Sequence, residues 1–197
     1  MVLVFNKWDV SGIAVVDAGL QRYINLSPRI VPRSGGVSAS KRFHKSKYFI
    51  VERLMNKILV SGHKGKKHFR SSGRTTGTAV NAYNTVLESF EILEKKTGKN
   101  PIEVFVRALE NGAPREEIIA IEYGGARYPK AVECSPQRRV DIALRWFVQG
   151  ALAKTINSKT KLVNSLAGEL FDAYSLSSRS NAITKKFDLE RQADSSR

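Results

Sequence analysis

The sequence has 197 residues, 42% of them hydrophobic, which is enough for one domain with a proper core, alone or with an extension. Its formal net charge of +15 indicates a polyanionic partner, either nucleic acid or an acidic membrane surface. No apolar run reaches the roughly 18 to 20 residues of a membrane-spanning helix, and the single cysteine, Cys134, allows no disulfide within the chain, which is typical of a reducing cytosol.

Residues 1–47 are predicted to form an N-terminal extension that is partly disordered when no partner is bound. They begin with MVLVFNKWD, which lacks the basic segment of a signal peptide, and they show no sustained hydrophobic period. The stretch RSGGVSASKRFHKSK has few apolar side chains to bury, so we expect it to fold on a partner. A flexible tail is the alternative, but the basic content favours a tail that lies on nucleic acid.

The positive charge is concentrated in residues 18–87. This segment has fourteen lysines and arginines and one acidic residue, Glu52, a net charge of +13, whereas residues 1–17 and 88–197 contribute −1 and +3. A solubility adaptation would be more evenly spread, while concentrated charge with few acids is typical of a surface that binds phosphates. We therefore expect nucleic acid rather than another polyanion as the partner.

Residues 48–197 are predicted to form a helical domain of about six helices, around residues 49–59, 80–93, 101–109, 136–151, 162–174 and 183–191. Hydrophobic residues recur at helical spacing, and prolines mark two of the starts, where Asn100 precedes Pro101 and Ser135 precedes Pro136. A basic loop, HKGKKHFRSSGRTTG, follows the first helix and lacks the spacing of a nucleotide-binding phosphate loop. The last helix has a mixed polar pattern and is expected to be peripheral.

The stretch EIIAIEYGGARYPKAVEC predicts one β-hairpin at about residues 116–134. Two β-rich runs flank Gly124 and Gly125, a pair typical of a two-residue hairpin turn. Pro129 would disrupt a central strand but is tolerated in a two-stranded ribbon, where both strands are edges. With so few strands, the sequence predicts a mainly α protein, a bundle of about six helices with one protruding β-hairpin and an extended basic N-terminal segment.

The sequence offers few residues for catalysis. His63 and His68 could bind a metal, but no cysteine or carboxylate stands near them, and Cys134 has no evident base partner, so a buried structural thiol is expected. Three glutamates recur at helical spacing, which is typical of a solvated face, although a metal-dependent nuclease or RNA-modifying enzyme is the alternative interpretation. These are Glu88, Glu91 and Glu94. We expect no catalytic residue, no metal and no cofactor.

The cations are better candidates for function. Arginine suits bidentate contacts with phosphate and stacking on bases, and aromatic side chains among cations favour RNA over a plain charged surface. Tyr123 and Tyr128, near the hairpin tip, fit this pattern, as do Phe43 and Tyr48 beside the basic segment. Arg138 and Arg145 are seven residues apart and therefore share one helical face. A helical DNA-binding protein is a further alternative.

Several segments together resemble the family of small-subunit ribosomal protein seven. The N-terminal extension and the block NGAPREE are typical of its archaeal and eukaryotic branch, and the archaeal form is the most similar. The resemblance covers essentially the whole chain, and its motifs are long and ordered. They are KWD, DAGLQRYINLSPRIVPRSGG, IVERLMNKIL, TGKNPIEVFVRALENGAPREE and GGARYPKAVECSPQRRVDIALRWF.

The resemblance implies a structural component of the small ribosomal subunit in the cytoplasm, folded as a helical bundle with a protruding β-ribbon. It implies a primary binder of the 3′ major domain of small-subunit rRNA, which nucleates assembly of the subunit head. The implied neighbours are small-subunit proteins nine and eleven, the E-site tRNA and the mRNA at its exit. No membrane is implied as a partner.

By this resemblance and by their charge, sixteen cations are expected to bind rRNA, and five hairpin residues are expected to lie near tRNA and mRNA. The cations are Lys41, Arg42, Lys45, Lys47, Arg53, Lys64, Lys66, Lys67, Arg70, Arg74, Arg115, Arg127, Lys130, Arg138, Arg139 and Arg145. The hairpin residues are Tyr123, Gly124, Gly125, Arg127 and Tyr128. The strand EIIAIEY has few cations where bacterial members carry arginines, so the returning strand is expected to bind phosphate more strongly.

Overall fold

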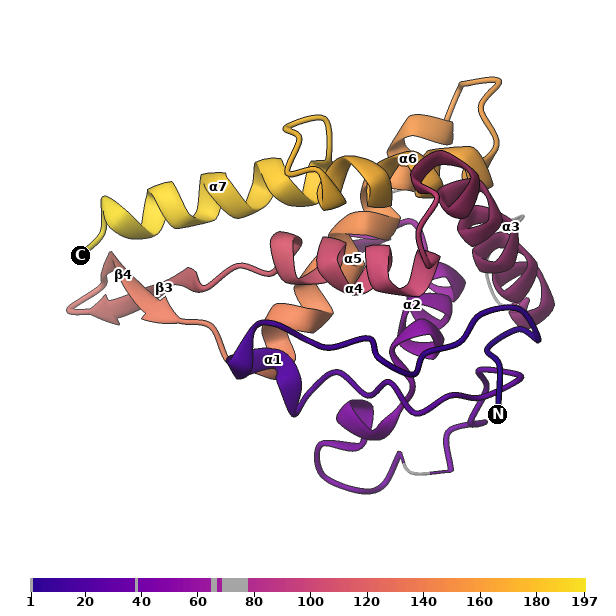
Figure 1. Cartoon of the computed structure of the whole chain (residues 1–197). Helices are drawn as coiled ribbons and strands as arrows, with labels where there is room; N and C mark the ends of the chain where they lie inside the picture. Colours follow the sequence, from indigo (N-terminus) through magenta and orange to yellow (C-terminus); the bar gives the residue numbers. More distant parts are fainter. Residues whose placement is uncertain (1, 38, 65–66, 69–77) are drawn as a thin grey trace.

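The computed structural model describes residues 2–37, 39–64, 67–68 and 78–197, and within them the protein is mainly helical (Figure 1). In these described ranges, seven α-helices form a bundle and a two-stranded antiparallel ribbon extends from it, which confirms the predicted fold class. The helices are α1 Ala18–Gln21, α2 Ile50–Leu59, α3 Ala79–Thr97, α4 Pro101–Gly112, α5 Pro136–Thr155, α6 Leu162–Tyr174 and α7 Asn181–Asp194. The strands of the ribbon are β3 Glu116–Tyr123 and β4 Ala126–Glu133. None of the helices in the described ranges is long and apolar enough to cross a membrane.

Four short elements were not predicted. α1 is a single turn, capped by Asp17, whose Oδ1 accepts a hydrogen bond from the backbone N–H of Gly19 at 2.9 Å. A 3₁₀ turn, η1 (His44–Lys47), precedes α2, and two strands of two residues each, β1 (His63–Lys64) and β2 (Lys67–His68), pair with each other after it. Elements of this length contain too few residues to show a hydrophobic period.

The core lies where α6 packs against α3, α4 and α5. Phe90, Phe105 and Phe147 are fully buried there, and the ring centroids of Phe90 and Phe105 are 5.8 Å apart. The predicted start of α4 is confirmed, because Oδ1 of Asn100 accepts a hydrogen bond from the N–H of Ile102 at 3.0 Å. Ser135, which was expected to cap α5, makes no such side-chain bond.

Part of the N-terminal segment belongs to the same core, although it lacks periodicity. The backbone N–H of Val4 donates to the carbonyl of Trp8 at 2.8 Å, and the ring centroid of Trp8 lies 6.0 Å from that of Phe90. Leu20 and Ile24 are also buried, and so is Tyr48, which the sequence pattern had grouped with the aromatic side chains expected to favour RNA. Residues 35–37 and 39–43, by contrast, are exposed. The partial disorder of residues 1–47 without a bound partner stays a prediction.

The ribbon is anchored at its base and free at its tip. Gly124 and Gly125 have φ angles of 59° and 81°, and two positive values are what the tightest hairpin turn requires. Residues 119–130 are exposed, whereas the base of the ribbon packs against α7, which runs beside it (Figure 1). Only three of its residues are buried, Ala182 and Ile183 at the end that docks on α5 and Ala193 near the ribbon, which agrees with the peripheral position expected for this last helix.

Candidate nucleic-acid interface

A groove lined by cations lies between α2 and the N-terminal half of α5. It consists of three hollows of about 400, 170 and 310 Å³. The hollows share lining residues: Lys45 and Asp141 line the first and second, Lys57 the second and third, and Arg145 the first and third. We call this continuous depression the basic groove. Its cations are Lys45, Arg53, Lys57, Arg138 and Arg145.

The helical repeat explains why these cations meet. Arg53 and Lys57 are four residues apart on α2, and Arg138 and Arg145 are seven apart on α5, so the members of each pair lie on one face of their helix. The opposite face of α5 is apolar and includes the fully buried Phe147. The packing that builds the core therefore also places Arg138 and Arg145 on the exposed face of α5.

Asp141 organises the cations of the basic groove. Its Oδ1 accepts a hydrogen bond from Nη2 of Arg53 at 3.2 Å, and its Oδ2 accepts one from Nζ of Lys45 at 3.1 Å. Burial acts to raise the pKa of Asp141, but Arg53 and Lys45 outweigh it and hold the pKa below its ordinary value. Burial lowers the pKa of Lys57, and repulsion from Arg145 adds to this effect, while Asp141 opposes it. A bound phosphate would relieve that repulsion, so the groove favours an anion.

Two of the predicted RNA-binding arginines are buried, and both have internal partners. Arg53 is 4% exposed, and its Nη1 donates to the carbonyl of Tyr23 at 3.0 Å, so it forms the floor of the groove. Burial lowers the pKa of Arg53, and Asp141 opposes the shift. Arg139 is 9% exposed, and its Nη2 donates to Oδ2 of Asp17 at 2.7 Å. Both guanidinium groups are therefore turned to acceptors inside the protein and not to its surface. Their acidic partners are 88 and 122 residues away along the chain, which is why sequence patterns missed them.

The remaining predicted cations fall in three places. Exposed on the segment before α2 are Lys41, Arg42 and Lys47. Exposed on the ribbon or just before it are Arg115, Arg127 and Lys130. Lys66, Arg70 and Arg74 lie outside the described residues, and Lys64 and Lys67 are described as backbone positions in β1 and β2. Lys57 was not predicted to bind RNA, although it lies four residues after Arg53 and therefore on the same face of α2.

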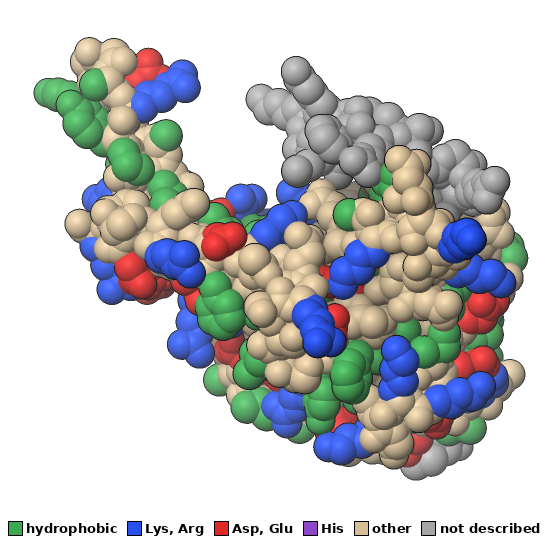
Figure 2. Space-filling view, turned by 90° about the horizontal axis from the view of Figure 1, so that it is seen from above, with side chains coloured by type: hydrophobic (Ala, Val, Ile, Leu, Met, Phe, Trp, Pro, Cys, Tyr) green, Lys and Arg blue, Asp and Glu red, His purple; other side chains and the backbone are tan. Residues whose placement is uncertain are grey.

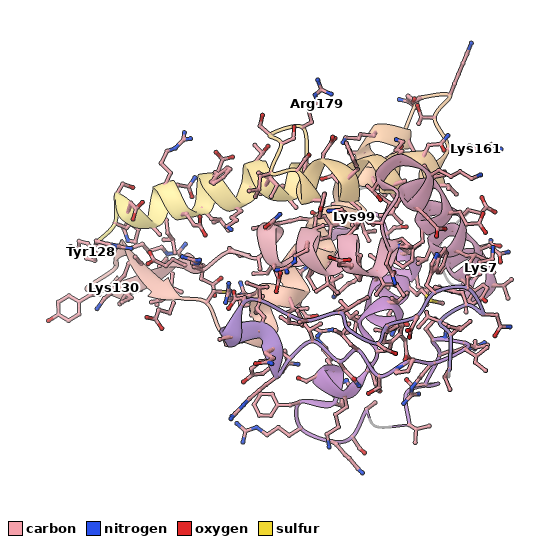
Figure 3. All side chains as sticks on the ribbon, viewed as in Figure 1. Lys7, Lys99, Tyr128, Lys130, Lys161 and Arg179 are labelled. Atoms are coloured by element: carbon pink, nitrogen blue, oxygen red, sulfur yellow. The ribbon has the colours of Figure 1, made fainter. Side chains whose placement is uncertain are left out.

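The tip of the ribbon presents an aromatic face. Tyr123 is 81% exposed and Tyr128 is 58% exposed. Ile121 pairs with Tyr128 and Tyr123 with Ala126, so both tyrosines lie on the same side of the ribbon. Figure 2 shows hydrophobic side chains along the arm that stands off the body, and Figure 3 places Tyr128 and Lys130 on that arm. The tip therefore has exposed rings and a cation, and no described part of the protein body covers these side chains.

The sequence that forms this fold can be compared with those of known families. The sequence model of the family described as "Ribosomal protein S7p/S5e" matches residues 20–197. The chain belongs to this family. "Small ribosomal subunit protein uS7" of Nanoarchaeum equitans is 49% identical over 193 residues, which cover 98% of each chain. The proteins of the same name from Archaeoglobus fulgidus and Cenarchaeum symbiosum are 46% and 44% identical over 100% of this chain and 95% and 97% of their own. The predicted resemblance to the archaeal form is confirmed.

In this S7p/S5e family member, the side chains that were considered for catalysis do not lie in the surroundings that catalysis requires. Glu91 forms an ion pair with Lys7, which Figure 3 labels, and Glu88 and Glu94 are exposed on α3. Over the described ranges there is no cluster of three histidine, cysteine or acidic side chains that could hold a metal ion. Burial, with the charge of Glu117, raises the pKa of the Cys134 thiol to about 11, so this thiol is protonated at neutral pH.

Proposed function

We propose that this chain is a structural component of the small ribosomal subunit, in cytoplasmic ribosomes, and that it binds rRNA in the basic groove. Family membership over nearly the whole chain supports the ribosomal assignment. The single observation that carries the site is the continuous depression between α2 and α5, lined by five cations and Asp141. A concave surface of this charge fits the phosphates of a folded RNA, whose bases in A-form helices are hidden in a deep and narrow groove.

The finer assignment follows from the family resemblance. The proposed target is the 3′ major domain of small-subunit rRNA, with a role in nucleating the subunit head next to small-subunit proteins nine and eleven. The exposed cations Lys41, Arg42 and Lys47 extend the basic groove along the N-terminal segment and would add phosphate contacts. The ribbon tip, with its two exposed tyrosines, is proposed to lie near the E-site tRNA and the exiting mRNA.

The salt dependence of binding to a 3′ major domain rRNA fragment tests the groove. Each lost phosphate contact should reduce the log–log salt slope by roughly 0.7 to 0.9. The triple variant Lys45→Gln, Arg138→Gln and Arg145→Gln should therefore lower the slope by about 2 to 3. The matched control is Lys159→Gln, Lys161→Gln and Arg179→Gln, which removes the same charge from exposed positions; Figure 3 labels the last two, far from α2. Equal slopes for the two variants would place the phosphates elsewhere, and a wild-type slope near zero would refute phosphate binding.

Association with the subunit is a separate measurement. The protein in its own cells should sediment with small subunits and stay with them after a high-salt wash. The proposed role is structural and requires no catalytic group, so rRNA incubated with the protein and Mg²⁺ should stay intact. Cleavage that depends on the metal and on Glu88, Glu91 and Glu94 would favour the nuclease alternative instead.

A further inference from the structure

The largest hollow of the basic groove is not lined by cations alone. It lies between the N-terminal segment and the first turns of α5 and has a volume of about 400 Å³, within the range of small-ligand sites. Lys45, Arg138 and Arg145 contribute the charge, and Tyr23, Phe43 and Ile142 contribute apolar surface. A site for phosphate alone would not need aromatic walls.

Phe43 has a position that core packing does not explain. Its side chain is 52% exposed, and it is not among the residues that form the hydrophobic core or pack against it. Its backbone has φ 56° and ψ 23°, a left-handed conformation that a bulky residue adopts at a cost. The guanidinium carbon of Arg42 lies 4.9 Å from the centroid of the ring. The ring therefore has exposed surface that the core does not use, beside a cation, and a flat ligand can stack on such a surface.

The charges and the ring around the hollow together indicate a nucleotide as its ligand. Asp141 also lines the hollow, but both of its oxygens accept hydrogen bonds from cations, so it orients Lys45 and does not leave a free carboxylate to repel phosphate. Cations on the walls and a ring on one side match the two parts of a nucleotide, its phosphates and its base. Bases inside an A-form duplex are stacked and cannot reach such a ring, so the base must be unpaired.

We propose that this hollow binds one unpaired nucleobase of rRNA, stacked on the ring of Phe43, with the flanking phosphates on Lys45, Arg138 and Arg145. The inference rests on the proposed rRNA-binding function and adds a subsite to it. It makes the groove selective for RNA that contains an extruded nucleotide. Stacking on an aromatic side chain corresponds to roughly a 5- to 150-fold effect on affinity per base.

Two RNA hairpins that differ in one base test the proposal. Both have the same stem with a one-nucleotide bulge; the bulged nucleotide is 2-aminopurine in one and abasic in the other, so the phosphates are equal in number. The full-length protein should bind the 2-aminopurine hairpin more tightly by a factor within the range above. Phe43→Leu should bring the ratio of the two dissociation constants close to one, while Phe43→Tyr should keep it. Phe187→Leu is the matched control, because Phe187 is 49% exposed on α7 and lies outside the groove.

The outcomes are distinct. A wild-type ratio near one, with tight and salt-dependent binding of both hairpins, would overturn the base subsite and leave the proposed function standing. The same ratio in Phe43→Leu as in the wild type would show that the base binds elsewhere and would also overturn it. If the wild type bound neither hairpin nor the rRNA fragment, the proposed function itself would fail. Thermal unfolding of Phe43→Leu should match that of the wild type, because the ring lies outside the core.

Discussion

Nη2 of Arg139 lies 2.7 Å from Oδ2 of Asp17, and this ion pair joins the N-terminal segment to the first turn of α5. Nε of the same arginine donates to the carbonyl of Pro114 at 3.1 Å, at the start of the ribbon. One guanidinium therefore holds three parts of the chain together. Arg138, its neighbour, is exposed and pairs with Glu117 at the base of β3. Adjacent arginines thus have different roles, one internal and one at the surface.

Removing the acidic partner of Arg139 should destabilise the fold. Asp17→Ala leaves a largely buried guanidinium with one backbone acceptor, so the free energy of unfolding should fall by about 1–3 kcal/mol. Urea unfolding measures the change. Asp188→Ala, on the exposed side of α7, is the control and should stay within about 0.5 kcal/mol of the wild type. An equal effect of both variants would mean that the ion pair contributes nothing.

The same pair predicts an acid dependence. Burial acts to raise the pKa of Asp17, but the hydrogen bond and charge of Arg139 outweigh it and hold the pKa below its ordinary value of 3.8. Because the pKa is lower in the folded state, the contribution of Asp17 to stability is complete above about pH 4 and is lost as the pH falls through the folded pKa. The difference in stability between wild type and Asp17→Ala, measured by urea unfolding from pH 6 to pH 3, should therefore become smaller toward the acid end. A constant difference across this range would contradict the expectation.

The two faces of α5 should respond differently to substitution. Phe147 is fully buried, so Phe147→Ala should cost about 3–5 kcal/mol of unfolding free energy. Arg138→Gln, on the exposed face, should leave folding nearly unchanged and weaken rRNA binding. A charge reversal at Arg139 should also destabilise the fold, as Phe147→Ala does, because it would place a carboxylate against Asp17. If Arg138→Gln unfolded the protein and Phe147→Ala did not, the two faces would be inverted.

Gly150 should be intolerant of a side chain for a steric reason. A Cβ there would lie 2.8 Å from Cβ of Asn181 and 2.9 Å from Cδ of Glu169. Glu169 cannot easily move, because it is fully buried and accepts hydrogen bonds from Lys154 and from Ser180. Gly150→Ala should therefore cost on the order of 1–3 kcal/mol.

Gly168 provides the control for Gly150. It lies within α6, and a Cβ built on it would have nothing within 4 Å. Gly168→Ala should stabilise the helix by roughly 0.5–1 kcal/mol, because alanine has the higher helix propensity. Thermal unfolding measures both effects, and destabilisation by both substitutions would show that the contacts with Asn181 and Glu169 are not the cause.

The outer part of the ribbon should be dispensable for folding. Residues 122–130 are exposed, while the base is held by α7 and by Arg197, whose Nη2 lies 2.6 Å from Oε1 of Glu116. Replacing residues 122–130 with a short Gly/Ser loop should leave the melting temperature and rRNA binding unchanged. Subunits reconstituted with the variant should retain E-site tRNA less well or keep the reading frame less accurately. Unfolding of the variant would make the ribbon part of the core, and wild-type behaviour in both assays would contradict the proposed position of the tip.

The sequence by itself determined the features that depend on neighbours along the chain. Asn100 and Pro101 start α4 because a cap and a fixed φ act within one turn. Gly124 and Gly125 form the hairpin turn because both central positions of the turn require a positive φ, which glycine adopts without strain. The spacing of Arg138 and Arg145 places them on one face of α5. The long motifs also identified the family, since their order and length do not depend on how the helices pack.

Only the tertiary structure decided which of the cations are available for RNA. Arg139 and Arg53 became internal because Asp17 and Asp141, far away in sequence, lie beside them in the fold. The packing of Trp8 on α3 likewise follows from a single ring filling a space between distant elements. A local pattern records a residue's charge and its face on a helix. Its burial and its partner depend on long-range packing, which no short window of sequence contains.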